Sequence, residues 1–403
     1  MNSNVSVRCN GADSKCCVHC CLCIVVLGKG NWIIAGEFDV GLIVYEMKKA
    51  FCIPALWAFI VLSLALNGLL ILGNDDIRDY FHIEKNIENN LEKTRGGNEV
   101  MNAPENIFVG YDTGALAAFY VEIVKESPTA VDWVQRKYSL LQPRVEHLAR
   151  SGAALDYYAG EATYESHQFL FGTLMRAMLA ESSICAMLVV LYLMGYEQLN
   201  RTEGTVCASR MGRWLWGKKL AAAMLSAAAL YIFVVGMTLI FYFGLWDYSG
   251  IWGDSVSSRF NYLTDMLHKR PFLTWGDFTI GGYLAAVLAL GAALVAVFAL
   301  IAAVCAMLFR NIYAAALMLA TVLFGGIGVG SLLSQCRLWA AYFITTLQPQ
   351  AVWLDVNVWF TESGIATFMP WQETVAVILN LALCGAAVWI VFRWFMRRDI
   401  VRE

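Results

Sequence analysis

The stretch closest to a chemical motif lies at residues 212–219 and reads GRWLWGKK. A phosphate-binding P-loop has the form GxxxxGK followed by Ser or Thr, because that hydroxyl holds magnesium, and it follows a β-strand. Here Lys219 stands where the hydroxyl is needed, and apolar runs flank the motif in place of a strand and a helix. We therefore expect no nucleotide binding at this stretch. We interpret Lys218 and Lys219 as anchors at the level of the lipid headgroups, and we expect Trp214 and Trp216 to lie at the lipid boundary.

A second candidate for chemistry is a group of cysteines near the N-terminus. Zinc sites usually join two pairs of ligands that are separated by a dozen or more residues. Only one such group is present, so we expect residues 1–39 to be a disordered extension, or an over-long start of translation, rather than a metal site. The group comprises Cys9, Cys16, Cys17, Cys20, Cys21 and Cys23, with His19 among them.

The other histidines are scattered and show no metal-binding spacing such as HExxH. No arrangement typical of a hydrolytic triad accompanies them. We therefore expect a chain without enzymatic activity of its own, with no catalytic residue, no directly bound cofactor and no metal. These histidines are His82, His147, His167 and His268.

Composition indicates a membrane protein. Of the 403 residues, 59% are hydrophobic and only 15% are charged, and the mean hydropathy is +0.56. A membrane-spanning helix needs about 20 consecutive apolar residues, and six runs satisfy that requirement. We therefore predict an all-α fold with six transmembrane helices. The runs cover residues 51–73, 171–196, 220–246, 278–309, 312–335 and 373–392.

The distribution of charge predicts how the chain is oriented. Loops rich in Lys and Arg stay on the cytoplasmic side, and basic residues precede the first run, follow the last, and dominate residues 197–219. Residues 74–172 carry sixteen Asp and Glu against nine Lys and Arg. We therefore expect both termini inside and residues 74–172 outside, in a multi-pass protein of the cell membrane, the cytoplasmic membrane of a bacterium.

After residues 1–39, the chain divides into three further parts. Residues 40–73 combine an amphipathic interfacial helix with the first span. Residues 74–172 form an extracytoplasmic region with helices near 115–125 and 130–150. Residues 173–403 hold the other five spans, a cytoplasmic loop at 197–219 and an apolar external segment at 336–372. That last segment is expected to contain short helices that dip into the outer interface.

Two features within the spans call for an interpretation. Glu181 is an ionisable residue inside an apolar run, which makes a functional role the first hypothesis. It could line a translocation path, or it could simply pair with nearby Arg176 or reach the outer interface. Gly326 and Gly330 have the GxxxG spacing of close helix packing. We prefer that reading to a dinucleotide fingerprint, because Ser331 takes the place of the last glycine.

The layout and several local sequences resemble ABC-2 type permeases, the membrane subunits of bacterial ABC exporters. The similar sequences are YEMKKAF before the first span, YEQLNRTEGT after the second, and MPWQETVAVILNLAL entering the sixth. The resemblance covers residues 40–398, and the cysteine-rich N-terminus departs from it. It implies a type V exporter-like fold and the export of a peptide or bacteriocin, a drug, a lipid or an ion.

The resemblance also implies partners. Such a permease pairs with a second copy or a homologous permease, and separate ATPase subunits bind ATP and magnesium and dock from the cytoplasm. A helix between the second and third spans transmits their closure. Here that helix maps onto residues 201–213, with Arg201, Glu203, Arg210 and Arg213 as the ATPase-coupling residues. No nucleic acid is expected as a partner.

Two other classes of function remain as alternatives. A secondary transporter would show an inverted repeat and broken helices with buried charges, and neither is evident. The chain could instead be a membrane-embedded sensor or scaffold that binds an extracellular ligand through residues 74–172. A neighbouring ATPase gene would separate these alternatives from the exporter.

Overall fold

The computed structural model describes residues 40–74, 106–155, 168–208, 212–246, 248, 252–258, 263–264, 269–309 and 311–397. The N-terminal cysteine group, residues 75–105 and Arg210 lie outside these ranges, and so do the predictions made for them. Residues 41–403 form one compact unit.

Six helices in the described residues are long and apolar enough to cross a membrane, which confirms the predicted number of spans. They begin and end within about three residues of the predicted runs, except that the third span starts five residues earlier and the sixth ends five residues later. The chain is therefore a multi-pass membrane protein. The helices are α2 (Pro54–Leu72), η3 with α7 (Gln168–Leu174 and Met175–Leu199), α9 (Leu215–Leu245), α10 (Ile280–Leu308), α11 (Ile312–Gln335) and α14 (Gln372–Arg397).

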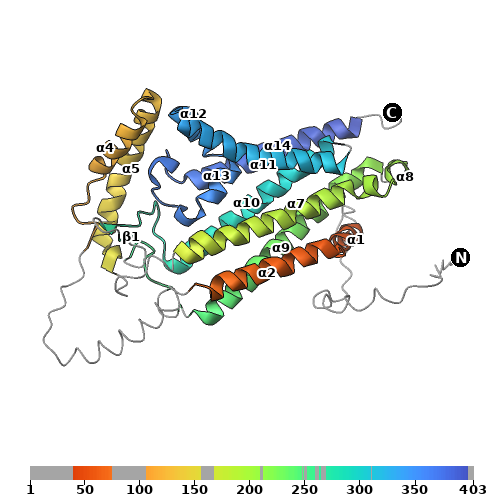
Figure 1. Ribbon diagram of the computed structural model, residues 1–403, viewed down its shortest axis with the longest axis horizontal. Helices are drawn as coiled ribbons and strands as arrows, with labels where there is room; N and C mark the ends of the chain where they lie inside the picture. Colours follow the sequence, from red (N-terminus) through yellow and green to blue (C-terminus); the bar gives the residue numbers. More distant parts are fainter. Residues whose placement is uncertain are drawn as a thin grey trace. The chain divides into compact units, whose positions relative to one another are not determined.

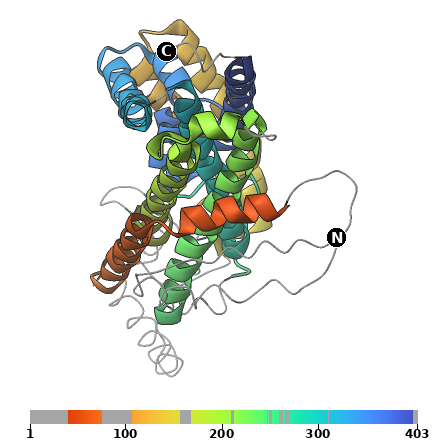
Figure 2. The same cartoon turned by 90° about the vertical axis from the view of Figure 1, so that its right-hand side faces the viewer.

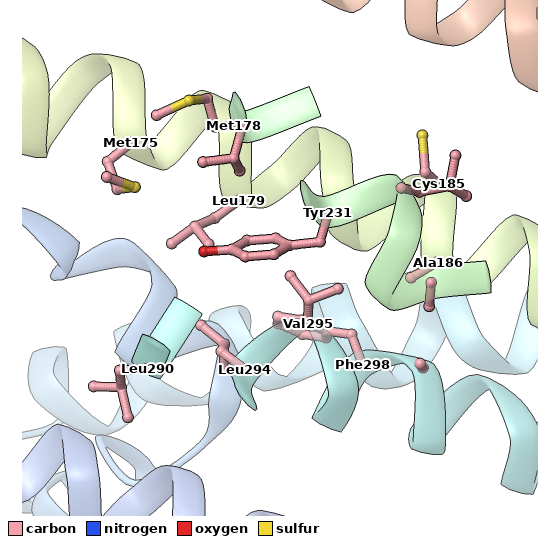
Figure 3. Packing of buried hydrophobic residues seen from close by; sticks show 14 of the residues in the cluster. Met175, Met178, Leu179, Cys185, Ala186, Tyr231, Leu290, Leu294, Val295 and Phe298 are labelled. Carbon is pink, nitrogen blue, oxygen red and sulfur yellow. The ribbon is translucent and has the colours of Figure 1, made fainter. Parts of the chain in front are cut away.

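Helix α7 lies at the centre of the packing. It contacts α2, α9, α10 and α11, and α14 packs on α10 (Figure 1). Along α7 most residues are buried, whereas few residues of α11 and α14 are. Figure 3 shows how Met178 and Leu179 of α7 meet Tyr231 of α9 and Leu294 of α10 in this core. The outer helices thus present apolar faces that suit contact with lipid.

The two ends of the bundle carry different structures. The loop end holds α1 (Val40–Phe51), α8 (Glu203–Cys207) and the C-terminal part of α14, where the rings of Trp216 and Phe395 are in contact. Helix α1 runs in a different direction from α2, as Figure 2 shows, because the chain turns at Ile53 before Pro54 begins the next helix. The insertion end holds α4 (Thr113–Val124) and α5 (Pro128–Ser151).

Helices α4 and α5 confirm the prediction of helices in this region. Asp112 and Ser127 cap their N-termini through side-chain oxygens, and Pro128 occupies the first turn of α5, where its missing N–H costs nothing. Pro143 lies inside α5, although a proline is expected to break a helix or to occupy its first turn. The segment at 336–372 also contains short helices, as expected. They are α12 (Trp339–Thr345), α13 (Pro349–Leu354), η6 (Val356–Val358) and η7 (Gly364–Ala366).

One detail corrects the all-α expectation. Residues Leu263–Thr264 (β1) and Lys269–Arg270 (β2) form an antiparallel pair, with Leu263 opposite Arg270. Each strand has only two residues, so the pair is a local hairpin and does not alter the helical architecture.

A buried lysine joins α5 to the segment before α14. The Lys137 side chain is fully buried, and its Nζ lies 3.0 Å from Glu362 Oε1, 2.6 Å from the Gly364 carbonyl and 3.1 Å from the Thr367 carbonyl. Tyr138 donates to the same carboxylate, and its ring stacks on Tyr120 of α4. Burial lowers the pKa of Lys137 although Glu362 opposes this effect. These contacts of Lys137 and Tyr138 hold α5 against the segment that precedes α14.

We expect Lys137→Ala to destabilise the protein by about 3 to 5 kcal/mol, because it leaves Glu362 buried without its cation. Thermal unfolding in detergent, followed by the fluorescence of tryptophans such as Trp133 in the same apolar cluster, measures the effect. The matched control is Lys125→Ala, which removes an exposed ion pair with Glu122 and should leave the unfolding midpoint nearly unchanged. Equal effects of the two substitutions would show that Lys137 is not a stabilising link.

Candidate functional site: buried charges at the two ends of a basic loop

The loop between α7 and α9 begins at a helix end of defined geometry. Arg201 has φ 56°, in the left-handed region that favours glycine. Its N–H reaches the Gln198 carbonyl, and the Thr202 N–H reaches the Glu197 carbonyl. This is the Schellman pattern that ends a helix. The Arg201 side chain is exposed, so it points away from the helix it terminates.

The helix within this loop is shorter than predicted. Sequence indicated two to three turns within residues 201–213, whereas α8 has five residues in the described part of the loop. Glu203 is its first residue, and Arg213 lies in the 3-10 turn η4 (Gly212–Trp214). The structure thus describes the backbone of three coupling candidates, and Arg210 lies outside the described residues.

The two tryptophans after the loop have different environments. Both were expected at the lipid boundary, and Trp214 is indeed 67% exposed. Trp216, by contrast, is 3% exposed and packs against Phe395 of α14 with the two rings tilted. The expectation for Trp216 is therefore wrong, because α14 extends past the predicted end of the sixth span and covers it.

Lys219 is the residue whose role sequence reasoning missed. It is fully buried rather than placed among headgroups, and its Nζ forms an ion pair with Glu197 and a 3.0 Å hydrogen bond to the Leu193 carbonyl. Glu197 lies near the end of α7 and Lys219 near the start of α9. The pair therefore joins the two ends of the loop. Removing one partner of a buried pair generally costs several kcal/mol.

Helix α1 supplies two more charges to the same cluster. Glu46 is 1% exposed, and its Oε2 lies 4.0 Å from Lys219 Nζ, while its Oε1 accepts a 2.7 Å hydrogen bond from Lys49. The Tyr196 ring lies beneath both ammonium groups, 4.5 Å from Lys49 and 5.5 Å from Lys219. Burial opposes the charge of Lys49, but Glu46 and Glu197 outweigh it and raise its pKa. Two cations and two anions thus form a neutral cluster.

This charge cluster, comprising Glu46, Lys49, Glu197 and Lys219, ties α1, α7 and α9 together at the loop end. A displacement of the loop therefore reaches three helices at once. The sequence held a signal for it: Glu197 and Lys219 bracket the loop with opposite charges, and both adjoin apolar runs. Their pairing was not deducible, because 22 residues separate them and hydropathy does not show which charges face inward.

Glu181, the candidate for a translocation path, lies in a different cluster. Its Oε2 accepts a 2.8 Å hydrogen bond from Asn67 Nδ2 of α2, and the same nitrogen lies 3.2 Å from Thr238 Oγ1 of α9. Asn67 and Thr238 are buried, and Glu181 is partly buried. The structure thus brings this carboxylate together with neutral polar groups from two other spans.

Arg176, considered as a partner for Glu181, has other neighbours. Its Nη2 donates to Asn357 Oδ1 at 3.3 Å, and its carbonyl accepts from Trp353 Nε1 at 3.0 Å. The guanidinium also acts on Asp355, where burial raises the pKa to about 6 and Arg176 opposes that rise. The arginine therefore belongs to the contact between α7 and the segment at 336–372.

Gly326 and Gly330 are packing positions, but their neighbours are not another span. A Cβ on Gly326 would lie 2.7 Å from Gln348 Oε1 and 2.9 Å from Gln350 Nε2, so no side chain fits there without displacement. At Gly330 a Cβ would lie 3.4 Å from Thr345 Oγ1. Gln350 also donates to the Val322 carbonyl of α11 at 3.2 Å. These glycines let α11 approach the short helices α12 and α13.

The described residues contain no group of three or more His, Cys, Asp or Glu side chains that could hold a metal ion. Comparison with models of protein families, with curated proteins and with solved structures finds no match for this chain. The fold and the site define a six-span membrane protein whose basic loop is held at both ends by a buried ion pair. Any more specific function is a proposal.

We expect a double-mutant cycle on Glu197 and Lys219 to show strong coupling. Glu197→Gln and Lys219→Met should each destabilise by about 3 to 5 kcal/mol, because each leaves the buried cluster with an unbalanced charge. The double variant should lose less than the sum, with a coupling of about 1 to 3 kcal/mol. Thermal unfolding of the purified variants in detergent measures all three. Additive effects would contradict a direct ion pair.

We expect Asp355 to make stability depend on pH. The pKa of Asp355 is about 6 in the folded protein, above its ordinary value, so folding favours the protonated carboxyl group. The contribution of this group to folding stability is therefore fully present at low pH and is lost as the pH rises toward 6. Asp355→Asn should therefore exceed the wild type in stability above about pH 6, by up to about 2 kcal/mol, and match it near pH 4. Unfolding midpoints across this pH range test the prediction, and a difference independent of pH would contradict it.

Proposed function

We propose that this chain is the permease subunit of an ATP-driven exporter of the ABC-2 type, located in the cytoplasmic membrane of a bacterium. The observation that carries the proposal is the buried ion pair between Glu197 and Lys219. It fixes both ends of the loop at the junction with α7 and α9, and Glu46 extends the same cluster to α1. A subunit that pushes on the loop therefore moves spans rather than only the loop.

The orientation that the proposal needs is supported by charge. The loop end carries Lys48 and Lys49 of α1, the basic loop, and Arg393 and Arg397 of α14. Basic residues of this kind remain in the cytoplasm. The loop then faces the compartment that supplies ATP, and α4 with α5 faces outward. The ATP and magnesium belong to the partner ATPase.

A second permease copy or a homologous permease completes the proposed assembly. Helices α11 and α14 carry large exposed apolar side chains, including Leu317, Phe324, Leu383 and Ile390. Such faces suit lipid or another apolar helix. The substrate class stays open among peptides, drugs, lipids and ions, because no geometry in the described bundle selects one.

We expect the loop to contact an ATP-binding protein in the host cell. A photo-crosslinking amino acid at Thr205, an exposed position of α8, should give an adduct that azido-ATP labels. The same group at Leu354, an exposed position of the insertion end, is the matched control and should give none. A label on the chain alone, or equal adducts at both positions, would contradict the proposal. A labelled protein at Leu354 only would favour a sensor that acts through its outer region.

Arg201 separates the effect of charge from the effect of backbone. Arg201→Gly keeps the left-handed geometry at no steric cost but removes the guanidinium, whereas Arg201→Lys keeps a charge without the paired donors. If Arg201 contacts the ATPase, Arg201→Gly should reduce co-purification of that subunit roughly tenfold or more, the size of an interface hot spot. Arg201→Lys should have an intermediate effect. Full co-purification of the Gly variant would show that Arg201 only ends the helix.

A further inference from the structure

The Glu181 cluster has features that the exporter proposal does not use. Glu181, Asn67 and Thr238 come from α7, α2 and α9, and all three meet at the Asn67 side-chain amide. Thr238 donates its own proton to the Val234 carbonyl at 2.9 Å, so its oxygen lone pairs face the amide. Asn67 is 1% exposed and Thr238 2%. The cluster is therefore an enclosed polar site within an apolar bundle.

The negative charge of Glu181 has no counter-ion in the part of the chain that the structure describes. Helix α2 contains no ionisable residue, and α9 carries its lysines, Lys218 and Lys219, near its other end. Cys185 lies one turn along α7 from Glu181, and Tyr242, one turn beyond Thr238, is hydrogen-bonded to Tyr248. None of these supplies a positive charge, and an uncompensated carboxylate in such surroundings is costly.

The amide of Asn67 leaves an acceptor available. Its Oδ1 is buried and has no hydrogen-bond partner among the described residues. The same is true of the hydroxyls of Ser182 and Ser183, next to Glu181. Rotating the amide by half a turn exchanges Oδ1 and Nδ2. The rotation gives up both hydrogen bonds of Nδ2 and brings Oδ1 next to the carboxylate, a cost that a positive charge held between these oxygens offsets. After it, oxygens of Asn67, Thr238 and Glu181 converge on one point.

We propose that this point is a binding site for one monovalent cation. Hard cations take oxygen ligands from carboxylates, amides and hydroxyls. A single positive charge neutralises the single carboxylate, whereas a divalent ion would leave a net positive charge in an apolar bundle. Asn67 precedes the end of α2 at Leu72 by five residues, about 7 Å at the helical rise. The cation therefore enters from the insertion end and ties α2, α7 and α9 together.

The test is equilibrium binding of radioactive sodium to the purified full-length chain in nanodiscs of neutral lipid, with choline keeping the ionic strength constant. We expect saturable binding of one ion per chain, and competition by potassium and lithium. Glu181→Gln, Asn67→Ala and Thr238→Val should each weaken binding roughly tenfold or more, as loss of a ligand or its support does. The matched control is Ser226→Ala, which removes another buried hydroxyl of α9 three turns away and should leave binding unchanged.

Each other outcome overturns the proposal. Undiminished binding by Glu181→Gln, in a variant that elutes as a single folded species, would place the ion elsewhere. Absence of saturable binding, together with a pH-dependent unfolding midpoint that Glu181→Gln abolishes, would identify a proton as the occupant. Thermal unfolding gives a second measurement: sodium should raise the midpoint of the wild type by roughly 2 to 4 °C and leave that of Glu181→Gln unchanged.

Discussion

A charge or polar group inside an apolar bundle needs a partner, since neither lipid nor packed side chains replace the water it loses. This requirement determines how the ends of the molecule are joined. Lys219 is satisfied by Glu197 at the loop end, and Lys137 by Glu362 at the insertion end. Both lysines are fully buried, and each connects elements far apart in the sequence. Hydrophobic burial forms the bundle, and these pairs set how its attached segments meet it.

Helix α7 is the element through which the two ends communicate. It carries Glu197 and Glu181, which are 16 residues apart, about 24 Å along the helix. Two residues before Glu181 the packing is tight: a Cβ on Gly291 of α10 would lie 2.7 Å from Leu179 Cδ2 and 3.0 Å from Tyr231 Oη. Tyr231 donates to the Leu288 carbonyl at 2.7 Å in the same place. A close-packed contact of three spans transmits displacement rather than absorbing it.

Sequence predicted the spans well, because the length and apolarity of a membrane helix are local properties of the chain. It also located the helices of the insertion end, whose boundaries depend on local caps such as Ser127. It did not find the partners of Glu181 or Lys219, since those lie on other helices and apolar composition does not reveal which faces meet. The wrong expectations for Lys219 and Trp216 have this common cause. Both residues lie near the end of a span, where the sequence pattern favours contact with lipid headgroups, whereas in the structure α1 and α14 cover that surface.

Two arginines show how an exposed side chain can be interpreted. Arg337 ends α11 as Arg201 ends α7, with positive φ and the same pair of backbone hydrogen bonds. A residue other than glycine there costs about 1 kcal/mol, so its side chain needs a reason to be present. Arg337 has one, because it pairs with Glu126 beside α4 and holds α11 to the insertion end. Within the described residues Arg201 forms no ion pair. In the proposed exporter, a carboxylate of the docked ATPase would supply the partner that Arg201 lacks within the described residues.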